Sequence, residues 1–315
     1  MVKTIAFLLL RLIATVLAVT FLSFAMVAFL PGDPVTTILG TAERDPAVEE
    51  QLREDLNLDD PFVVRYLSWL GDAATGDLGN SYVTDQPVAD SIRSRLPVTL
   101  QLAVMSVLIS VIAAIPIGVM GAYRQSKWQD TASSAFVQVA LSIPNFIVGI
   151  FLIWFFAVQL DWLPASGWSR LSDGVVDNLK TAILPATALA LGQMAIFSRL
   201  IRSDMIATLK ENYILSARAK GLSDRYILFR HALRPSSLSL MTIVGISFGV
   251  LLGGTVVIET LFGLPGLGFS LINAINGRDI LVIQGITVFI AVMFVIINTV
   301  VDLMYAVLDP RIRRS

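Results

Sequence analysis

The chain reads Asn212-Tyr213-Ile214-Leu215-Ser216-Ala217-Arg218-Ala219-Lys220-Gly221-Leu222 at the centre of a polar island, residues 199–235. Apolar runs long enough to cross a bilayer lie on both sides of this island. The island carries eight Lys or Arg residues, namely Arg199, Arg202, Lys210, Arg218, Lys220, Arg225, Arg230 and Arg234. Because positive charge collects in the cytoplasmic loops of membrane proteins, we expect the island to lie in the cytosol.

The centre of the island has the residue types of a docking surface. Small side chains at Ser216, Ala217 and Ala219 leave room for a close partner, and Gly221 lets a helix stop and turn. We therefore predict a docking site formed by Ser216, Ala217, Arg218, Ala219, Lys220, Gly221 and Leu222. The alternative is a solvated loop whose charges only fix the topology.

The composition is that of a polytopic membrane protein. Hydrophobic residues make up 55% of the chain and charged residues 15%, and the mean hydropathy is +0.75. Such a chain is too apolar for a soluble domain. The net charge of −1 hides a segregation, since acidic residues crowd residues 33–90 while basic residues dominate the loops placed inside. A nucleic-acid partner is not expected.

Hydropathy predicts an all-α fold with six transmembrane helices. The predicted spans are residues 5–30, 98–123, 132–158, 182–200, 236–258 and 280–308. This gives a first transmembrane helix within residues 1–30, an extracytoplasmic segment over 31–97, and a five-helix core over 98–315 with the cytosolic loop 199–235. Both termini are expected in the cytosol. A cleavable signal peptide is the alternative for the first span.

The extracytoplasmic segment is acidic. With Asp33 included, residues 33–97 hold thirteen Asp or Glu against five Arg. Apolar residues at helical spacing predict two short amphipathic helices, over 47–56 and 62–70. A second outer segment, residues 259–279, contains Leu264-Pro265-Gly266-Leu267-Gly268 and is predicted to be rigid and rich in turns.

Two spans carry special features. Pro144 in the third span frees a carbonyl group, so a kink facing protein or water is expected there. In the fifth span, Gly245, Gly249 and Gly253 fall four apart and predict a face that another backbone approaches closely, near the pathway. The alternative for this face is ordinary helix packing with no transport role.

Catalytic and nucleotide chemistry is missing from the sequence. No stretch reads Gly-x-x-x-x-Gly-Lys-Ser/Thr, so the usual phosphate-binding loop is absent. With His231 as the one histidine and no cysteine, neither a zinc site nor a Cys-His nucleophile is expected. We predict no catalytic residues, no metal and no cofactor in this chain. Asp302, close to the basic C-terminal end, is interpreted as an interfacial structural residue, with a proton relay as the alternative.

Several motifs resemble the permease subunits of ATP-binding-cassette importers. The run from Leu215 to Gly221, followed by a long gap to the region of Pro235, resembles their cytosolic loop, although the broad family pattern begins Glu-Ala-Ala. The dipeptide, oligopeptide and nickel branch has similar motifs throughout. They are Pro31-Gly32-Asp33-Pro34, Gly76-Asp77-Leu78-Gly79-Asn80-Ser81, Ala217-Arg218-Ala219-Lys220-Gly221-Leu222, His231-Ala232-Leu233-Arg234, Leu264-Pro265-Gly266-Leu267-Gly268 and Asp309-Pro310-Arg311-Ile312-Arg313.

The resemblance implies a type I importer permease in a bacterial inner membrane. It implies a second homologous permease subunit around one pathway, one or two ATPase subunits that bind ATP and Mg, and an extracytoplasmic substrate-binding protein. The cargo implied is a dipeptide or oligopeptide, with nickel complexes or glutathione as alternatives. A secondary transporter is the competing class, but it should show inverted repeats and ionisable residues near mid-bilayer.

Overall fold

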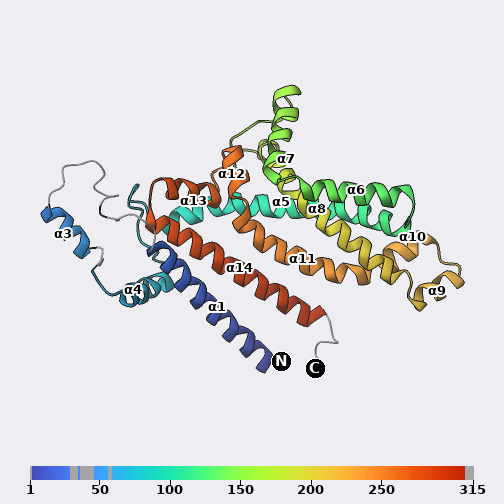
Figure 1. Ribbon diagram of the computed structural model, residues 1–315, viewed down its shortest axis with the longest axis horizontal. Helices are drawn as coiled ribbons and strands as arrows, with labels where there is room; N and C mark the ends of the chain where they lie inside the picture. Colours follow the sequence, from blue (N-terminus) through green and yellow to red (C-terminus); the bar gives the residue numbers. More distant parts are fainter. Residues whose placement is uncertain (1, 29–34, 36–45, 56–58, 309–315) are drawn as a thin grey trace. The chain divides into compact units, whose positions relative to one another are not determined.

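The computed structural model describes residues 2–28, 35, 46–55 and 59–308, and their regular secondary structure is helical (Figure 1). The prediction of an all-α protein is confirmed. The helices are α1 (Val2–Ala28), α3 (Pro46–Asp55), α4 (Phe62–Thr75), α5 (Val88–Tyr123), α6 (Trp128–Ser142), α7 (Asn145–Leu152), α8 (Val175–Thr208), α9 (Asn212–Ala219), α10 (Asp224–Tyr226), α11 (Leu233–Gly254), α12 (Val256–Phe262), α13 (Leu267–Asn276) and α14 (Ile280–Leu308). Two segments are π-helical, η1 (Ile153–Gln159) and η2 (Ile227–Ala232).

The described helices provide four to six candidate membrane spans. Four stretches are long and apolar enough alone, namely Val88–Tyr123, Val175–Thr208, Asp224–Gly254 and Ile280–Val301. Two helix pairs pass the same test only when each pair is taken together, α6 with α7–η1 and α12 with α13. The described apolar part of α1, Leu10–Met26, is shorter. The prediction of a polytopic helical membrane protein is therefore confirmed.

The third predicted span is broken rather than merely kinked. α6 ends at Ser142, α7 begins at Asn145, and the two arms of the pair differ in direction by 98°. Ile143 is extended, with φ −96° and ψ 120°, as expected before a proline that crowds the helical conformation of its predecessor. Pro144 thus interrupts the helix as predicted, but one continuous span over residues 132–158 was the wrong description.

The predicted turn-rich outer segment also contains helix. α12 and α13 flank the Leu264-Pro265-Gly266 turn, and Gly263 ends α12 in the left-handed conformation with φ 61°. These helices have 7 and 10 residues, too short for periodicity to separate them from a loop. The Pro31–Pro34 and Asp309–Arg313 motifs and the side chain of Asp302 lie outside the described residues.

The chain divides into two compact units, and each is described by itself. The first unit comprises Met1–Thr99 and Pro265–Val300, and the second comprises Leu100–Leu264 and Val301–Ser315. In the first unit, α3 and α4 confirm the two predicted amphipathic helices. α4 packs on α1: Tyr66 and Thr20 share a hydrogen bond of 2.9 Å, and the rings of Phe62 and Tyr66 lie edge-on to Phe24.

Asp279 connects two parts of the first unit. The carboxylate accepts hydrogen bonds from Ser81 Oγ at 2.5 Å and from the backbone N–H of Tyr82 at 3.3 Å. Burial, more than any nearby charge, raises the pKa of the Tyr82 phenol. Next to this network, Val88 and Ile92 of α5 pack with Leu267 and Ile286 in one hydrophobic cluster.

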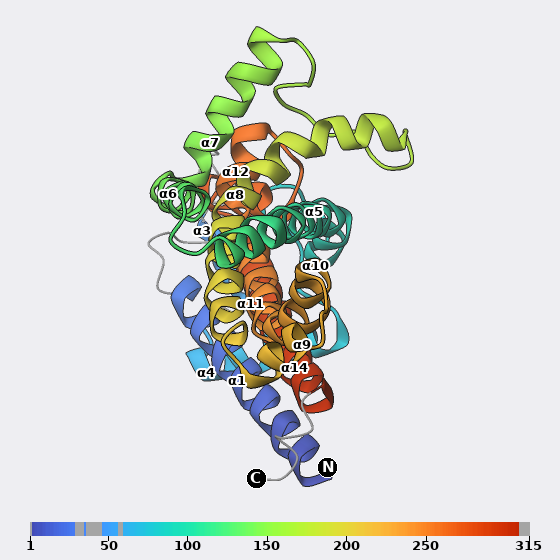
Figure 2. The same cartoon turned by 90° about the vertical axis from the view of Figure 1, so that its right-hand side faces the viewer.

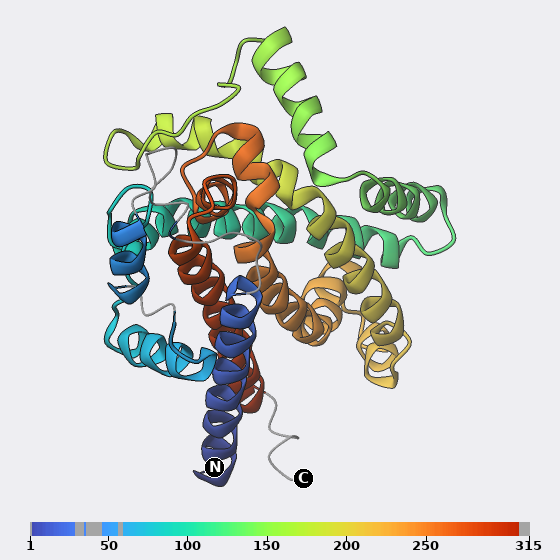
Figure 3. The ribbon, with the colours of Figure 1, turned by 60° about the vertical axis from the view of Figure 1, so that its left-hand side comes forward.

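In the second unit, α8 lies against α6, α7 and α11. Figures 1 and 3 show the yellow α8 between the green α6 and the orange α11. Phe197, Ile201 and Met205 of α8 are fully buried, in a cluster with Ala114 of α5 and Leu240 of α11. This cluster lies where α8 approaches the polar island, so α8 provides the support for the candidate site.

A stripe of small residues on α5 faces α8. Its members are spaced four apart and are all buried, namely Ser106, Ser110, Ala114, Gly118 and Ala122. Ser110 Oγ donates to the carbonyl of Ala190 at 3.0 Å. A Cβ atom added to Gly118 would lie 2.8 Å from the carbonyl oxygen of Ser198. Small residues at this spacing let helix backbones approach closely in lipid.

Candidate functional site

The polar island folds into two short helices joined by a tight turn. α8 ends at Thr208, α9 occupies Asn212–Ala219, and α10 follows at Asp224–Tyr226. Figures 1 and 2 show α9 and α10 together at the ends of α8 and α11. From Asp224 the helix continues through the π-helical η2 into α11 without a break. The island is therefore folded structure rather than an irregular loop.

Gly221 gives the turn its geometry. Its φ of +76° is left-handed, a conformation that favours glycine. The N–H of Gly221 donates to the carbonyl of Arg218 at 2.9 Å, and the N–H of Leu222 donates to that of Ala217 at 3.3 Å. These two bonds form a Schellman motif, which satisfies carbonyl groups that a helix end leaves free. The structure thus places Gly221 at the predicted stop of the helix.

One face of α9 is turned into the molecule. Ile214 and Ala217 are buried with Ile227 of η2 in a small cluster that Leu209 completes. The methyl group of Ala217 therefore packs against the chain's own residues. Ala217 is thus turned inward, because a helix of two turns must use one face to hold itself in place, and the docking of a partner on this segment stays a prediction.

The other face of α9 and the turn are exposed. Ser216, Arg218, Ala219, Lys220 and Gly221 are all exposed, as is Leu222. No atom lies within 4 Å of the position that a Cβ of Gly221 would take. Four exposed apolar side chains extend this surface, namely Leu215, Leu222, Tyr226 and Phe229. We call these four residues, together with the exposed residues of α9 and the turn, the coupling surface. A hollow beside them is lined by Ser223, Arg225, Tyr226, Phe229 and Arg230.

Three side-chain contacts stabilise this surface, and the first of them links it to α5. Tyr123 at the end of α5 donates to Asp224 Oδ2 at 2.8 Å. Tyr213 donates to the carbonyl of His231 at 3.4 Å. Partial burial, and secondarily the Glu211 carboxylate, raise the pKa of Tyr213, so this phenol keeps its proton as a donor. The His231 ring lies edge-on to Tyr226, with 5.3 Å between centroids.

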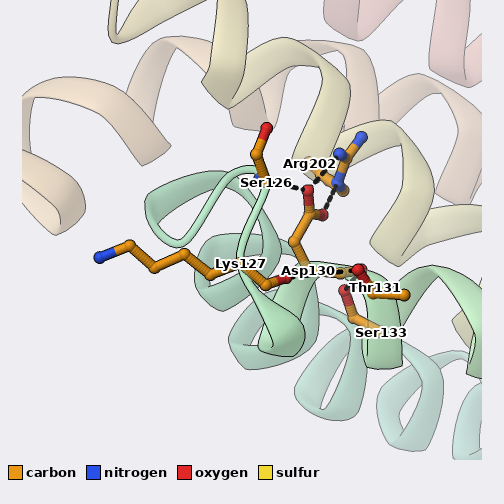
Figure 4. A network of polar contacts seen from close by, with 6 residues as sticks. All are labelled: Ser126, Lys127, Asp130, Thr131, Ser133 and Arg202. Carbon is orange, nitrogen blue, oxygen red and sulfur yellow. Dashed lines mark hydrogen bonds and ion pairs between the residues drawn. The ribbon is translucent and has the colours of Figure 1, made fainter.

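An ion pair joins the start of α6 to α8 (Figure 4). Arg202 donates from Nε to Asp130 Oδ1 at 2.5 Å and from Nη2 to Oδ2 at 2.9 Å. The backbone N–H of Ser126 also donates to Oδ2, at 3.0 Å. Such a two-pronged contact fixes the direction of both side chains. The ion pair holds the short loop between α5 and α6 against α8. This pair was not predicted from the sequence.

The three predicted glycines of α11 lie in different surroundings. Gly249 is buried, whereas Gly253 is exposed. A Cβ atom on Gly245 would lie 2.2 Å from Cγ2 of Val301, so the Val301 side chain lies very close to the backbone of α11 at this point. Among the described residues, no group of three or more His, Cys, Asp or Glu side chains could hold a metal ion.

The arrangement of the helices is that of membrane subunits in solved ABC transporter structures. A chain in an inward-facing structure of the MetNI methionine ABC transporter matches with a TM-score of 0.59 and 17% identity, covering 70% of this chain and 96% of that one. A chain in the crystal structure of an amino acid ABC transporter with histidines matches with a TM-score of 0.54 and 18% identity, covering 70% and 94%. At these identities the likeness establishes the fold.

The family follows from the sequence comparisons. The model of the binding-protein-dependent transport system inner membrane component matches residues 114–314, and that of the N-terminal part of such membrane components matches residues 1–103. The chain therefore belongs to this family of importer permeases.

Curated relatives match over nearly their whole length. A putative peptide transport system permease of Brucella abortus is 40% identical over 301 residues, covering 96% of each chain. The dipeptide transport system permease of Alkalihalophilus pseudofirmus is 35% identical over 325 residues, and the glutathione transport system permease of Shigella flexneri is 38% identical over 305 residues. Each of these two matches covers 97% of both chains. The predicted family resemblance is confirmed.

Proposed function

We propose that this permease lines half of a peptide-import pathway and that its coupling surface receives force from a separate ATPase subunit. The geometry of α9 carries the proposal. One face of α9 is held by Ile214, Ala217 and Ile227, while Leu215, Ser216 and Arg218 are exposed. A helix anchored in this way can be pushed as a unit, because its apolar cluster ties it to η2 and so to α11.

The partner that fits this surface is an acidic, partly apolar cleft. Arg218, Lys220, Arg225 and Arg230 surround the exposed Leu222 and Phe229. Opposite charge on the partner would steer the encounter, and the exposed apolar side chains would be buried in the complex. ATP and Mg would then bind to the ATPase partner. The complete importer would contain this chain, a second homologous permease and one or two kinds of ATPase subunit.

The proposed topology places residues 199–235 and both termini in the cytosol and residues 31–97 outside. Lys and Arg in the short loops support this orientation, with Arg124 and Lys127 between α5 and α6 on the same side as the coupling surface. The acidic outer segment with α3 and α4 would lie on the side from which a substrate-binding protein docks. The membrane would be the bacterial cytoplasmic membrane.

Cysteine labelling tests the orientation. The chain has no native cysteine, so Ser216→Cys on α9 and Thr75→Cys on α4 introduce unique, exposed thiols. Intact cells treated with a membrane-impermeant maleimide should label Thr75→Cys and leave Ser216→Cys unlabelled until the cells are opened. The reverse pattern would refute the topology.

The cargo is proposed to be a short peptide. The named relatives support this class, since they are called peptide, dipeptide and glutathione permeases. Uptake of dipeptides, longer peptides, glutathione and nickel complexes should be compared in liposomes that contain the permease, its co-expressed subunits and the binding protein. ATP-dependent uptake of nickel complexes alone would contradict the peptide assignment.

A further inference from the structure

A partly open cavity of about 180 Å³, lined by both polar and apolar side chains, lies between α5, α6 and α8 within the second unit. It is separate from the coupling surface. Its lining residues are Ile117, Ser133, Ser134, Val137, Gln138, Leu141, Ser198, Arg199 and Arg202. The volume equals the share of about six water molecules in the liquid, which is enough for a small charged group.

One excess positive charge, that of the exposed Arg199, belongs to the cavity lining. Arg202 lies beside Asp130 in the ion pair of Figure 4, so these two charges balance. Arg199 has no hydrogen bond or ion pair with any other residue that the structure describes. The same holds for the side-chain groups of Ser134 and Gln138. A guanidinium, a hydroxyl and a carboxamide are therefore available to an anionic group with several acceptor oxygens.

The position of Arg199 along α8 places the cavity at the level of lipid headgroups. Residues 181–198 of α8, between Lys180 and Arg199, carry no charged side chain. At about 1.5 Å per residue this stretch is about 27 Å long, close to the hydrocarbon thickness of about 30 Å. Lys180 and Arg199 therefore lie at the two ends of the stretch that crosses the bilayer core. Arg199, the first residue of the polar island, lies in the leaflet on the island's side of the membrane.

Apolar side chains next to the cavity point outward from the chain. Leu141 lines the cavity and is 41% exposed, while Val139 on α6 and Ile196 on α8 are 58% and 38% exposed. Ile196 lies one helical turn from Arg199, toward the middle of the bilayer. A ligand with a charged head and apolar tails would contact the polar lining and this surface together. A free phosphate ion would contact only the lining.

We propose that this cavity binds the phosphodiester group of an anionic phospholipid, with Arg199 as the main contact and Ser134 and Gln138 as further donors. The bound lipid would rest against the α6–α8 junction that Asp130 and Arg202 hold together. The site does not depend on the transported substrate or on the ATPase partner. Its failure would therefore leave the proposed transport function intact.

The test is retention of phosphatidylglycerol by the purified full-length permease, measured by native mass spectrometry after partial delipidation. Wild-type permease should keep one phosphatidylglycerol molecule in preference to phosphatidylcholine. Arg199→Gln should weaken apparent binding about tenfold or more, because a charge-assisted contact is lost. Lys127→Gln is the matched control, since Lys127 is an exposed cation directly before α6 that does not line the cavity. It should change binding by less than about twofold.

Two further variants separate the contribution of charge from that of the hydroxyl group. Arg199→Lys retains the charge and should bind better than Arg199→Gln, and Ser134→Ala should weaken binding in a permease with an intact Arg199. Equal retention by Arg199→Gln and wild type would overturn the proposal. Displacement of the lipid by inorganic phosphate at an equal concentration would assign the site to a free anion instead and would also overturn it.

Discussion

Replacing Gly118 with valine tests the close contact between α5 and α8. The Cβ position of Gly118 lies 2.8 Å from the carbonyl oxygen of Ser198 and from Cβ and Cγ2 of Ile201, whereas ordinary contact begins near 3.4 Å. The helices would have to separate by about 0.6 Å before any γ-methyl group is placed. A backbone carbonyl cannot swing aside, so we expect the upper part of the overpacking range, about 2–3 kcal/mol.

Valine rather than alanine isolates the packing effect, since glycine and valine differ in helix propensity by only a few tenths of a kcal/mol. Gly71→Val is the matched control. Gly71 lies within α4, and no atom lies within 4 Å of its Cβ position. The free energy of unfolding, measured by steric trapping in lipid bicelles, should fall for Gly118→Val and stay within about 0.5 kcal/mol for Gly71→Val. If both variants keep the wild-type free energy, α5 and α8 are not in the contact described.

Three other predictions concern the site and its supports. Gly221→Asn should keep ATP-driven uptake in liposomes and Gly221→Val should lose it, because asparagine tolerates φ of +76° and a β-branched residue is strained there by about 1–3 kcal/mol; equal activity of both would show that the turn does not matter for coupling. Asp130→Asn and Arg202→Gln should each lower the unfolding free energy, with a coupling of about 1–3 kcal/mol in the double-mutant cycle, and simple additivity would contradict the pair. Gly245→Leu should reduce expression and uptake through its clash with Val301, and wild-type levels of both would place this face toward lipid.

The membrane elements were largely predictable because bilayer thickness imposes a length on every span. Hydropathy found all the long helices, and Pro144 marked the place where the third span breaks. The 98° bend could not be read from the sequence, since a proline removes a hydrogen bond without setting the direction of the next helix. The two short helices around Leu264-Pro265-Gly266 were not predicted, because helices this short do not show a clear periodicity of apolar residues.

The residue types in the sequence predicted the candidate site, but they did not predict which face of α9 is buried and which is exposed. Ala217 and Ala219 look alike in the sequence, yet one is buried and the other exposed. Only the cluster of Ile214 with Ile227 decides which face is turned inward. The α5 stripe from Ser106 to Ala122 was not predicted although its spacing of four is visible in the sequence, because serine and alanine are common in helices and mark a close contact less distinctly than glycine does.

The helix from Asp224 to Gly254 has a mechanical consequence. It spans 31 residues without a break, so at about 1.5 Å per residue it is a rod about 46 Å long. A tilt of about 10° about one end of such a rod moves the other end by about 8 Å. Its one softer part is the wider turn at Ile227–Ala232. Under the proposed function, a small movement at the α9–α10 end would therefore become a larger displacement at the Gly254 end, and η2 is where the helix would bend.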